Sequence, residues 1–360
     1  MAGRGEERTG LALKFQTGLA LKLHAPGEAL ERLADPRSGE RFGPHGDEPL
    51  LAIDLAAGAG PESVSPSRRE AAQLALASLP CPHVGVAREP GELDAGRAAL
   101  AKRLDLVVES AEACAEVVRA VVAQPIAAAA LVQLLRLSEG RSVADGLVAE
   151  SLTYSTLQAG PGFAAWLLLR GAPRPRATDV GPAVRVARRG DHLELVLARP
   201  AKRNAFSAAM RDALCEALGV AVADASIRDV TLSGDGPDFC SGGDLDEFGS
   251  LPDPASAHAI RTTRSPARLL AACAARATVR VHGACVGAGV ELPAFASRVV
   301  AAPDARFWLP ELSMGLVPGA GGTVSLPPRI GRQRTAWMAL TGARVDARTA
   351  KAWGLVDAIA

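Results

Sequence analysis

The second half of the chain alternates apolar and polar residues in a pattern that predicts a sheet. Five apolar positions carry the alternation, and a turn at 189–191 would join them into two antiparallel strands. These positions are Val184, Val186, Leu193, Leu195 and Leu197. Short apolar runs at 230–232 and 279–281 lead into loops and helical patterns, and the same rhythm recurs at Val299. This repetition predicts stacked β-β-α units rather than an open dinucleotide-binding sheet.

The pattern in the first half predicts a smaller α/β unit. An apolar run at 50–55 suits a strand, and two more short strands are expected at 83–87 and 104–108. A helix should begin at Pro66, with Ser65 as its N-cap. No Gly-rich phosphate fingerprint accompanies these strands, so the pattern does not indicate a nucleotide site.

Helical periodicity dominates the middle of the chain. Apolar residues recur at helical spacing over 111–123, 126–137 and 143–170, with a break at 160–162. The segment 171–182 is rich in proline and glycine, which indicates a linker between two domains.

The first 48 residues carry a short repeat. The sequence T-G-L-A-L-K occurs at 9–14 and again at 17–22, and its alternating leucines could form a hairpin. We favour a partly disordered leader that ends in a linker, because 35–49 is rich in glycine, proline and charge.

Composition excludes several classes of function. The 360 residues carry a net charge of +1 and only 4% aromatic residues, so neither nucleic acid nor an anionic membrane is an expected partner. No apolar run reaches the roughly 18 residues that cross a bilayer, and no secretory signal pattern opens the chain. The six cysteines lack metal-ligand spacing. We expect a reduced, cytoplasmic protein without a metal.

The stretch 279–323 concentrates residues suited to acid–base chemistry. A short strand leads into small residues at 287–289, where a ligand could approach the backbone closely. Glu291 follows in the first turn of a predicted helix, and Glu311 lies 20 positions later, near a second Gly-rich turn. Two carboxylates beside free helix-start amides suggest proton transfer next to a stabilised oxyanion.

This stretch resembles the crotonase (enoyl-CoA hydratase/isomerase) superfamily. Upstream, the segments 199–207 and 233–245 resemble that family's first CoA-binding turn and its first oxyanion-hole loop. Downstream, 340–357 resembles the stretch after the core. The motifs follow the family's order over about residues 180–360, and they imply its α/β spiral of β-β-α units.

The resemblance assigns roles to four positions. It implies that the amides of Gly243 and Ala288 hold the thioester oxygen of an acyl-CoA. It also implies that Glu291 and Glu311 hold the water that adds across the C2–C3 double bond, with Glu311 as the main base. A plainer interpretation makes Glu311 a surface partner of a helix start and Glu291 a solvated first-turn carboxylate.

The same resemblance places further residues around the substrate. Lys202 and Arg203 would lie near the CoA phosphates, although exposed basic residues are common. The other predicted substrate-binding residues are Ala205, Ser241, Gly242, Asp244, Leu245, Gly287, Trp308 and Gly319. Phe248 and Leu316 are candidate walls of the acyl pocket or core residues, and His282 is interpreted as structural.

Two local departures from the family stand out. Pro293 follows Glu291 by two residues, where it removes a helical N–H and could shift the helix start that aims Ala288. Ser297 stands where the family often has aspartate.

The larger departure is in domain order. The chain ends at Ala360, where relatives continue into helices, whereas residues 103–170 resemble the family's C-terminal helical region. We therefore expect a leader and linker over 1–48, a degenerate crotonase-like domain over 49–170, a linker over 171–182 and the catalytic core over 183–360. The helices of 111–170 are expected to cover the core.

These features predict an enoyl-CoA hydratase that acts on an acyl-CoA thioester and needs no separate cofactor. An isomerase or acyl-CoA hydrolase of the same fold is the first alternative. A weakly catalytic acyl-CoA-binding assembly subunit is the second. The family implies a homotrimer or a dimer of trimers.

Overall fold

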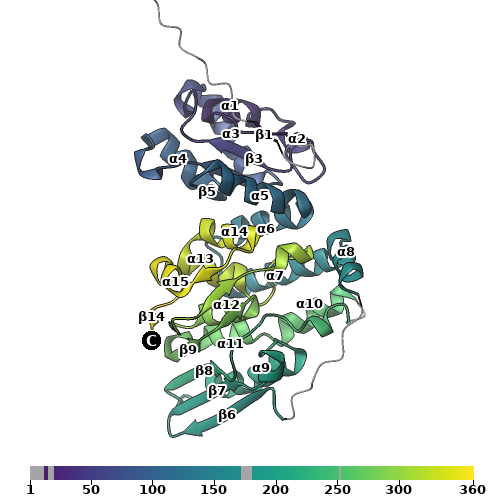
Figure 1. The fold of residues 1–360 in the computed structure, drawn as a ribbon, viewed down its shortest axis with the longest axis vertical. Helices are drawn as coiled ribbons and strands as arrows, with labels where there is room; N and C mark the ends of the chain where they lie inside the picture. Colours follow the sequence, from purple (N-terminus) through teal and green to yellow (C-terminus); the bar gives the residue numbers. More distant parts are fainter. Residues whose placement is uncertain (1–11, 15–19, 172–180, 251–252) are drawn as a thin grey trace, which may run out of the picture. The chain divides into compact units, whose positions relative to one another are not determined.

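The computed structural model describes residues 12–14, 20–171, 181–250 and 253–360. The chain forms two compact units, 1–136 and 137–360 (Figure 1). Most of the expected leader repeat and of the expected linker falls within 1–11, 15–19 and 172–180, which lie outside the described residues.

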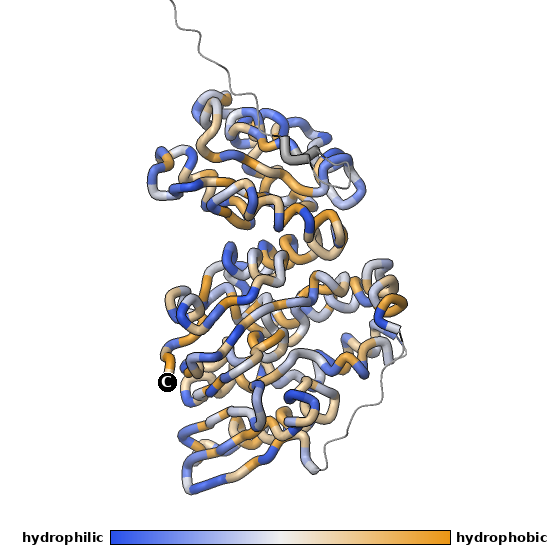
Figure 2. The backbone as a smooth tube through the Cα atoms, in the orientation of Figure 1, coloured by the Kyte–Doolittle hydropathy of each residue, from blue (hydrophilic) through white to orange (hydrophobic). Residues whose placement is uncertain are grey.

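The first unit is built on a three-stranded parallel sheet in the order β3-β4-β5. All three strands lie where the apolar runs predict them, and Figure 2 shows apolar residues along the strands at the centre of this unit. Its strands are β1 (Ala12–Lys14), β2 (Ala20–Lys22), β3 (Leu51–Asp54), β4 (His83–Val86) and β5 (Leu106–Val108). Its helices are α1 (Pro26–Leu33), α2 (Ser38–Arg41), η1 (Pro61–Ser63), α3 (Pro66–Ser78), η2 (Pro90–Glu92), α4 (Ala95–Arg103), α5 (Ala111–Ala123) and α6 (Pro125–Ser138).

The expected leader over 1–48 needs correction in its second part. Leu30 and Leu33 of α1 are buried in the core of the first unit, together with Phe42. The His24 N–H also donates to the Ala52 carbonyl (3.0 Å), which attaches this segment to β3. The sequence did not indicate that this segment is part of the core. Its glycines and prolines at 35–49, which lie in short turns, are typical of a linker, and the apolar face of α1 spans only two turns.

The second unit has a six-stranded sheet in the order β14-β11-β9-β8-β7-β6. The hairpin of β6 and β7 is antiparallel, with Val186 opposite Leu195, and the remaining pairs are parallel. A smaller sheet has the order β10-β12-β13. The strands are β6 (Val184–Arg189), β7 (His192–Leu197), β8 (Asp229–Gly234), β9 (Ala277–Val281), β10 (Ala284–Val286), β11 (Arg298–Ala301), β12 (Arg306–Trp308), β13 (Val345–Asp346) and β14 (Ala358–Ile359).

The chain passes repeatedly from the large sheet to the small sheet and then into a helix. It does so through β9, β10 and α12, and again through β11, β12 and α13. This order confirms the predicted spiral of β-β-α units. The helices are α7 (Val143–Gln158), α8 (Pro161–Arg170), η3 (Pro200–Lys202), α9 (Ala208–Ala223), η4 (Leu245–Glu247), α10 (Pro254–Thr263), α11 (Pro266–Ala272), η5 (Ala274–Arg276), α12 (Ala288–Glu291), η6 (Pro293–Phe295), η7 (Glu311–Met314), α13 (Gly322–Ile330), α14 (Arg332–Thr341) and α15 (Ala347–Trp353).

Helices α7 and α8 belong to the second unit, not to the domain 49–170 in which the sequence placed them. Helix α7 packs beside α10, α11 and α13 (Figure 1). Helix α8 packs against η7. The contact between α8 and η7 is close, because a Cβ built on Gly315 would lie 2.6 Å from the backbone of Gly162. The unit boundary therefore falls after Arg136 rather than at 171–182. Helices α7 and α8 pack on the core as expected, whereas α5 and most of α6, which were expected to cover it too, fall in the first unit.

No single helix among the described residues is long and apolar enough to cross a membrane. Helices α5 and α6 meet the length and composition criteria only as a pair, and they are bent by 110° where they join.

Candidate functional site

Two isolated parallel bridges hold the predicted site loops together. One bridge pairs Phe206 with Gly243, and the other pairs Cys240 with Cys285. In the second bridge, the Cys240 N–H donates to the Ala284 carbonyl (3.1 Å), and the Cys240 carbonyl accepts from the Val286 N–H (2.9 Å). Positions 243 and 288 each lie three residues beyond this bridge along parallel segments. The two predicted oxyanion amides are therefore carried by neighbouring loops.

The amides of Gly243 and Ala288 donate no hydrogen bond to any residue that the structure describes. In the first bridge, Phe206 bonds to the residues on either side of Gly243, so the Gly243 N–H is not used in pairing. Ala288 is the first residue of α12, whose first amides have no partner within the helix. Gly287 before it has φ of 48°, a conformation that favours glycine.

Glu291 is a buried carboxylate, only 2% exposed. Its Oε2 accepts hydrogen bonds from the amides of Ala320 (2.7 Å) and Gly322 (2.8 Å). Burial raises the pKa of Glu291 well above its usual value, and the charges of Glu311 and Glu150 raise it further. The solvated first-turn interpretation of Glu291 is therefore wrong.

Glu311 opens η7 beside Glu291. A Cβ built on Gly287 would overlap Oε1 of Glu311 and lie 3.7 Å from Oε1 of Glu291, so both carboxylates face the glycine backbone. Oε2 of Glu311 is buried and has no hydrogen-bond partner among the described residues. Burial raises the pKa of Glu311 to about 8. Glu311 as a whole is half-buried, and the burial of its Oε2 atom argues against the interpretation of this side chain as a surface partner of a helix start.

A third carboxylate, which the sequence analysis missed, completes the cluster. Glu150 of α7 is 2% exposed and accepts hydrogen bonds from the Gly321 amide (2.7 Å), the Thr323 amide (2.9 Å) and the Thr323 hydroxyl (2.6 Å). Burial raises its pKa to about 7 against these hydrogen bonds, which lower it. The available signal was an acidic residue on the same helix face as the buried Gly146 and Leu157.

Tyr154 lies one turn after Glu150 and was also missed. Its ring packs against Gly319, where an added Cβ would overlap the ring carbons. The guanidinium of Arg261 lies 4.7 Å from the ring centroid. Burial raises the pKa of Tyr154 above its usual value, and the charge of Glu311 adds to this. Helix α7 thus supplies two residues to the site.

The two basic residues predicted for CoA differ in their availability. Lys202 forms ion pairs with Asp246 (3.0 Å) and Asp244 (3.4 Å), and its side chain is 12% exposed. The hydrogen bond to Asp246 raises its pKa. The Arg203 side chain is 69% exposed and lies 3.4 Å from Asp238. Arg203 is therefore the more accessible cation.

Most of the remaining predicted substrate residues hold the loops in place. Asp244 is buried and accepts from Arg199 (3.0 Å) as well as from Lys202. The Ser241 N–H donates to the Arg203 carbonyl (3.0 Å), and the Gly287 N–H donates to the Trp308 carbonyl (3.1 Å). Three others lie on the same loops: Ala205 and Gly242 beside the first bridge, and Leu245, whose carbonyl accepts from Arg170.

Aromatic residues of α8 cover the first oxyanion loop. Phe163 and Trp166 stack with centroids 5.8 Å apart, and the Trp166 ring lies 5.8 Å from the Phe248 ring. Phe248 in turn limits position 243, because an added Cβ there would lie 2.7 Å from its ring. His282 bonds through Nε2 to the Gly236 carbonyl (2.9 Å), which agrees with a structural role.

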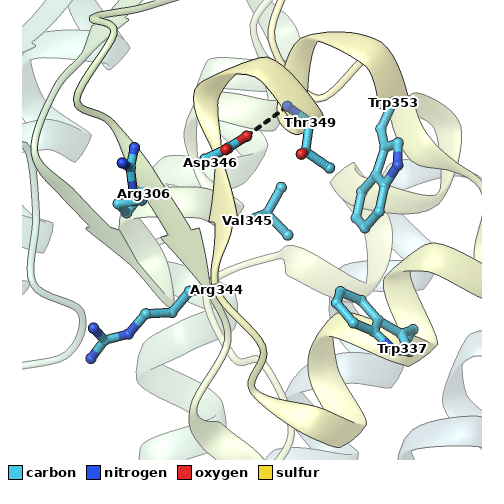
Figure 3. Close-up of a pocket in the computed structure, with 7 residues that line it drawn as sticks. All are labelled: Arg306, Trp337, Arg344, Val345, Asp346, Thr349 and Trp353. Atoms are coloured by element: carbon cyan, nitrogen blue, oxygen red, sulfur yellow. Dashed lines mark hydrogen bonds between the residues drawn. The ribbon is translucent and has the colours of Figure 1, made fainter. Parts of the chain in front are cut away.

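A separate pocket of about 510 Å³ lies between β12, β13, α14 and α15 (Figure 3). Trp337 and Trp353 line one side of it, and Arg306 and Arg344 lie across from them. It includes none of the predicted site residues. Within the described residues, no group of three or more His, Cys, Asp or Glu side chains could hold a metal ion.

Comparison with known proteins points to one family. The profile of enoyl-CoA hydratase/isomerase matches residues 192–360. The chain is 37% identical over 174 residues to the 2,3-dehydroadipyl-CoA hydratase of Escherichia coli (strain K12), covering 48% of this chain and 67% of that one. It is 33% identical to the 1,2-epoxyphenylacetyl-CoA isomerase of the same organism, covering 46% and 64%. A solved enoyl-CoA hydratase structure from Mycobacterium smegmatis is 35% identical, covering 50% and 70%, with a TM-score of 0.46.

These matches span about two thirds of the length of each relative and lie in the second half of this chain. The relatives named here include a hydratase and an isomerase, so their similarity indicates a family and not one reaction.

Proposed function

Because the chain belongs to the enoyl-CoA hydratase/isomerase family, we propose that it adds water across the C2–C3 double bond of a 2-enoyl-CoA thioester. One observation carries the proposal. Glu291 and Glu311 each place a carboxylate oxygen close to the backbone of Gly287. The predicted oxyanion amides, those of Gly243 and Ala288, donate to no described residue.

The amides of Gly243 and Ala288 would bind the thioester oxygen. As water adds to C3, negative charge develops on that oxygen through the conjugated enolate. Fixed N–H donors stabilise this charge, and one good donor contributes about 3–4 kcal/mol to the transition state. The bridges that hold the two loops support such preorganisation, because the donors need not reorient during the reaction.

The two carboxylates would divide the proton transfers. Glu311 Oε2 has no partner among the described residues, so it is free to take a proton from water as the water oxygen bonds to C3. Glu291 would orient this water through Oε1 and return a proton to C2. Burial raises the pKa values of both Glu291 and Glu311. Two neighbouring carboxyl groups with raised pKa values can share one proton between them.

Arg203 is the better candidate for the CoA phosphates. Its guanidinium is exposed, whereas the Lys202 ammonium already has two carboxylate partners. Arginine can bind a phosphate through two parallel hydrogen bonds.

An isomerase is the second candidate, and one observation favours it. Oε2 of Glu291 is already held by two backbone amides, which leaves Glu311 as the carboxylate with an unpartnered oxygen. A single mobile base is sufficient to move a proton between C2 and C4 of an enoyl thioester.

The test is incubation of the purified chain with crotonyl-CoA and, separately, with a 3-enoyl-CoA. Hydration predicts loss of the enoyl-thioester absorbance and a product heavier by one water. Isomerisation predicts gain of that absorbance from the 3-enoyl substrate without a change in mass. Free thiol would indicate a hydrolase, and binding without turnover would indicate an assembly subunit; either result would contradict the proposal.

Assembly as a homotrimer or a dimer of trimers is part of the proposal. Sedimentation equilibrium of the full chain measures its mass directly. A monomer at micromolar concentration would contradict it.

A further inference from the structure

Two glutamates from different elements hold one Gly-rich turn, residues 319–323. Glu291 accepts from the amides of Ala320 and Gly322. Glu150 accepts from the intervening Gly321 amide and from Thr323. Successive amides of the turn therefore point alternately to the two carboxylates.

The turn needs both partners. Gly321 has φ of 108° and immediately precedes α13, so the amides here are those that a helix start leaves without intrahelical partners. A buried amide without a partner is destabilising, because it loses its hydrogen bond to water without a replacement. The turn also packs tightly on Glu291, since a Cβ on Gly322 would lie 2.7 Å from Cγ of Glu291. The position of this catalytic candidate thus depends on the conformation of the turn.

Helix α7 holds Glu150 firmly against the turn. Arg261 of α10 donates to Ser151 Oγ (3.1 Å), to Ser155 Oγ and to Gln158 Oε1 (3.2 Å). One turn before Glu150, Gly146 packs against Val324, where an added Cβ would lie 2.9 Å away. Contacts on two sides therefore fix the register of α7 relative to α10 and α13.

In the part of the chain that the structure describes, ionisable groups from four elements surround Glu150. Arg261 lies on α10, together with His258, whose Nδ1 is 2.9 Å from Ser151 Oγ. Tyr154 lies on α7 itself. Glu291 on α12 and Glu311 on η7 complete the set, and the charge of Glu150 acts on both.

We propose that Glu150 is a positioning residue for the reaction: it fixes the turn that orients Glu291, and it places a third buried carboxyl group on the turn that Glu291 holds. This inference rests on the proposed acid–base function of that pair. It gives helix α7, which precedes the family-matched region, an indirect part in the chemistry that acts through Glu291.

The charge has a measurable effect on pH dependence. A negative Glu150 raises the pKa of both Glu291 and Glu311, so removing it should lower both. Activity requires an ionised base and a protonated acid, so it rises with pH through one pKa and falls through the other. Because Glu150 is ionised mainly above about pH 7, the upper limb of the pH profile of kcat/KM should move to lower pH in Glu150→Gln.

The set of variants separates charge from hydrogen bonding. Glu150→Gln removes the charge. Thr323→Val keeps the carboxyl group and removes one donor that favours its ionised form, so kcat should fall while the upper limb of the pH profile moves less than in Glu150→Gln. Glu139→Gln is the matched control, because Glu139 is 69% exposed and pairs with Arg332 at the surface. If Glu150→Gln does not fold, Glu150→Asp keeps the charge on a shorter side chain and should retain the pH profile with a lower kcat.

Direct titration makes the test independent of turnover. Carboxyl carbons of labelled glutamate report the ionisation of Glu291 and Glu311 by NMR. If the pKa values of Glu291 and Glu311 fall in Glu150→Gln and do not change in Glu139→Gln, the inference is supported. This holds even if the protein does not hydrate enoyl-CoA, in which case only the proposed function fails. Unchanged titration together with an unchanged pH profile in a folded, active Glu150→Gln protein would overturn the role of Glu150 alone.

Discussion

At the scale of single residues, Glu311 makes the sharpest prediction. Glu311→Gln removes the carboxylate whose Oε2 has no partner among the described residues, and it keeps the side-chain volume. We expect kcat for hydration to fall by about 10² or more, with KM for the enoyl-CoA nearly unchanged. Steady-state kinetics measure both parameters. Glu194→Gln, at a partly exposed ion pair with Arg189, serves as control. A Gln variant with the parental rate would refute the assignment.

The oxyanion site is best tested at Ala288. Gly243→Pro would also delete an amide, but its ring carbons would meet Phe248. Ala288 occupies the first position of α12, where proline is tolerated because the amide needs no helical partner. Ala288→Pro should lower kcat by about 10²–10³ and abolish the spectral shift of a bound chromophoric acyl-CoA. A folded variant that retains the shift would remove Ala288 from the site.

The raised pKa of Glu311 also predicts a pH dependence of stability. A carboxyl whose pKa is near 8 when folded and 4.5 as reference binds its proton more tightly in the folded state. Its stabilising contribution is therefore complete below about pH 4.5 and is lost as the pH rises through 8. Relative to Glu311→Gln, the parental protein should lose a few kcal/mol between pH 5 and pH 9, at about 1.4 kcal/mol per pKa unit. Urea unfolding at several pH values measures this. Parallel stability curves would contradict it.

At the scale of elements, α8 should stabilise the loop that carries Gly243. Phe163 is 3% exposed and stacks with Trp166, and both rings lie against Phe248. Phe163→Ala should destabilise the second unit by about 3–5 kcal/mol, because it leaves a cavity beneath the loop. Chemical denaturation gives the value. Leu169→Ala, at a position that is 88% exposed, should change stability by less than about 0.5 kcal/mol. Equal effects of the two substitutions would show that α8 is not packed as described.

At the scale of the whole molecule, the family-matched region should depend on the helices before it. A fragment of residues 137–360 keeps α7 and α8 and corresponds to a compact unit. A fragment of residues 178–360 loses Glu150, the ring against Gly319 and the cover over Phe248. We expect the longer fragment to fold and the shorter one to associate or precipitate, because it exposes apolar surface and unpaired amides. Circular dichroism and light scattering distinguish them. A shorter fragment that is soluble and fully active would contradict this dependence.

The sequence by itself determined the features that depend on neighbouring residues. Alternation, helical periodicity and the Ser65-Pro66 start signal specified strands β3 to β9 and β11 and the helices of the middle region, because these patterns arise from the local geometry of the backbone. The order of motifs also identified the family and its spiral fold. It brought Gly243, Ala288, Glu291 and Glu311 forward as candidates, although it left the burial of the two glutamates open.

Only the tertiary structure decided which distant residues meet. Glu150 lies 171 positions before Gly321, and no local pattern links an acid on a helix to a turn so far away. The sequence indicated Lys202 as a cation available to phosphates, whereas in the fold it forms ion pairs with Asp244 and Asp246. The membership of α7 and α8 in the second unit also depends on contacts with residues far along the chain. An apolar helix face predicts that the helix is buried, but not which element buries it. Local geometry thus fixed the elements, and long-range packing fixed the third carboxylate of the site.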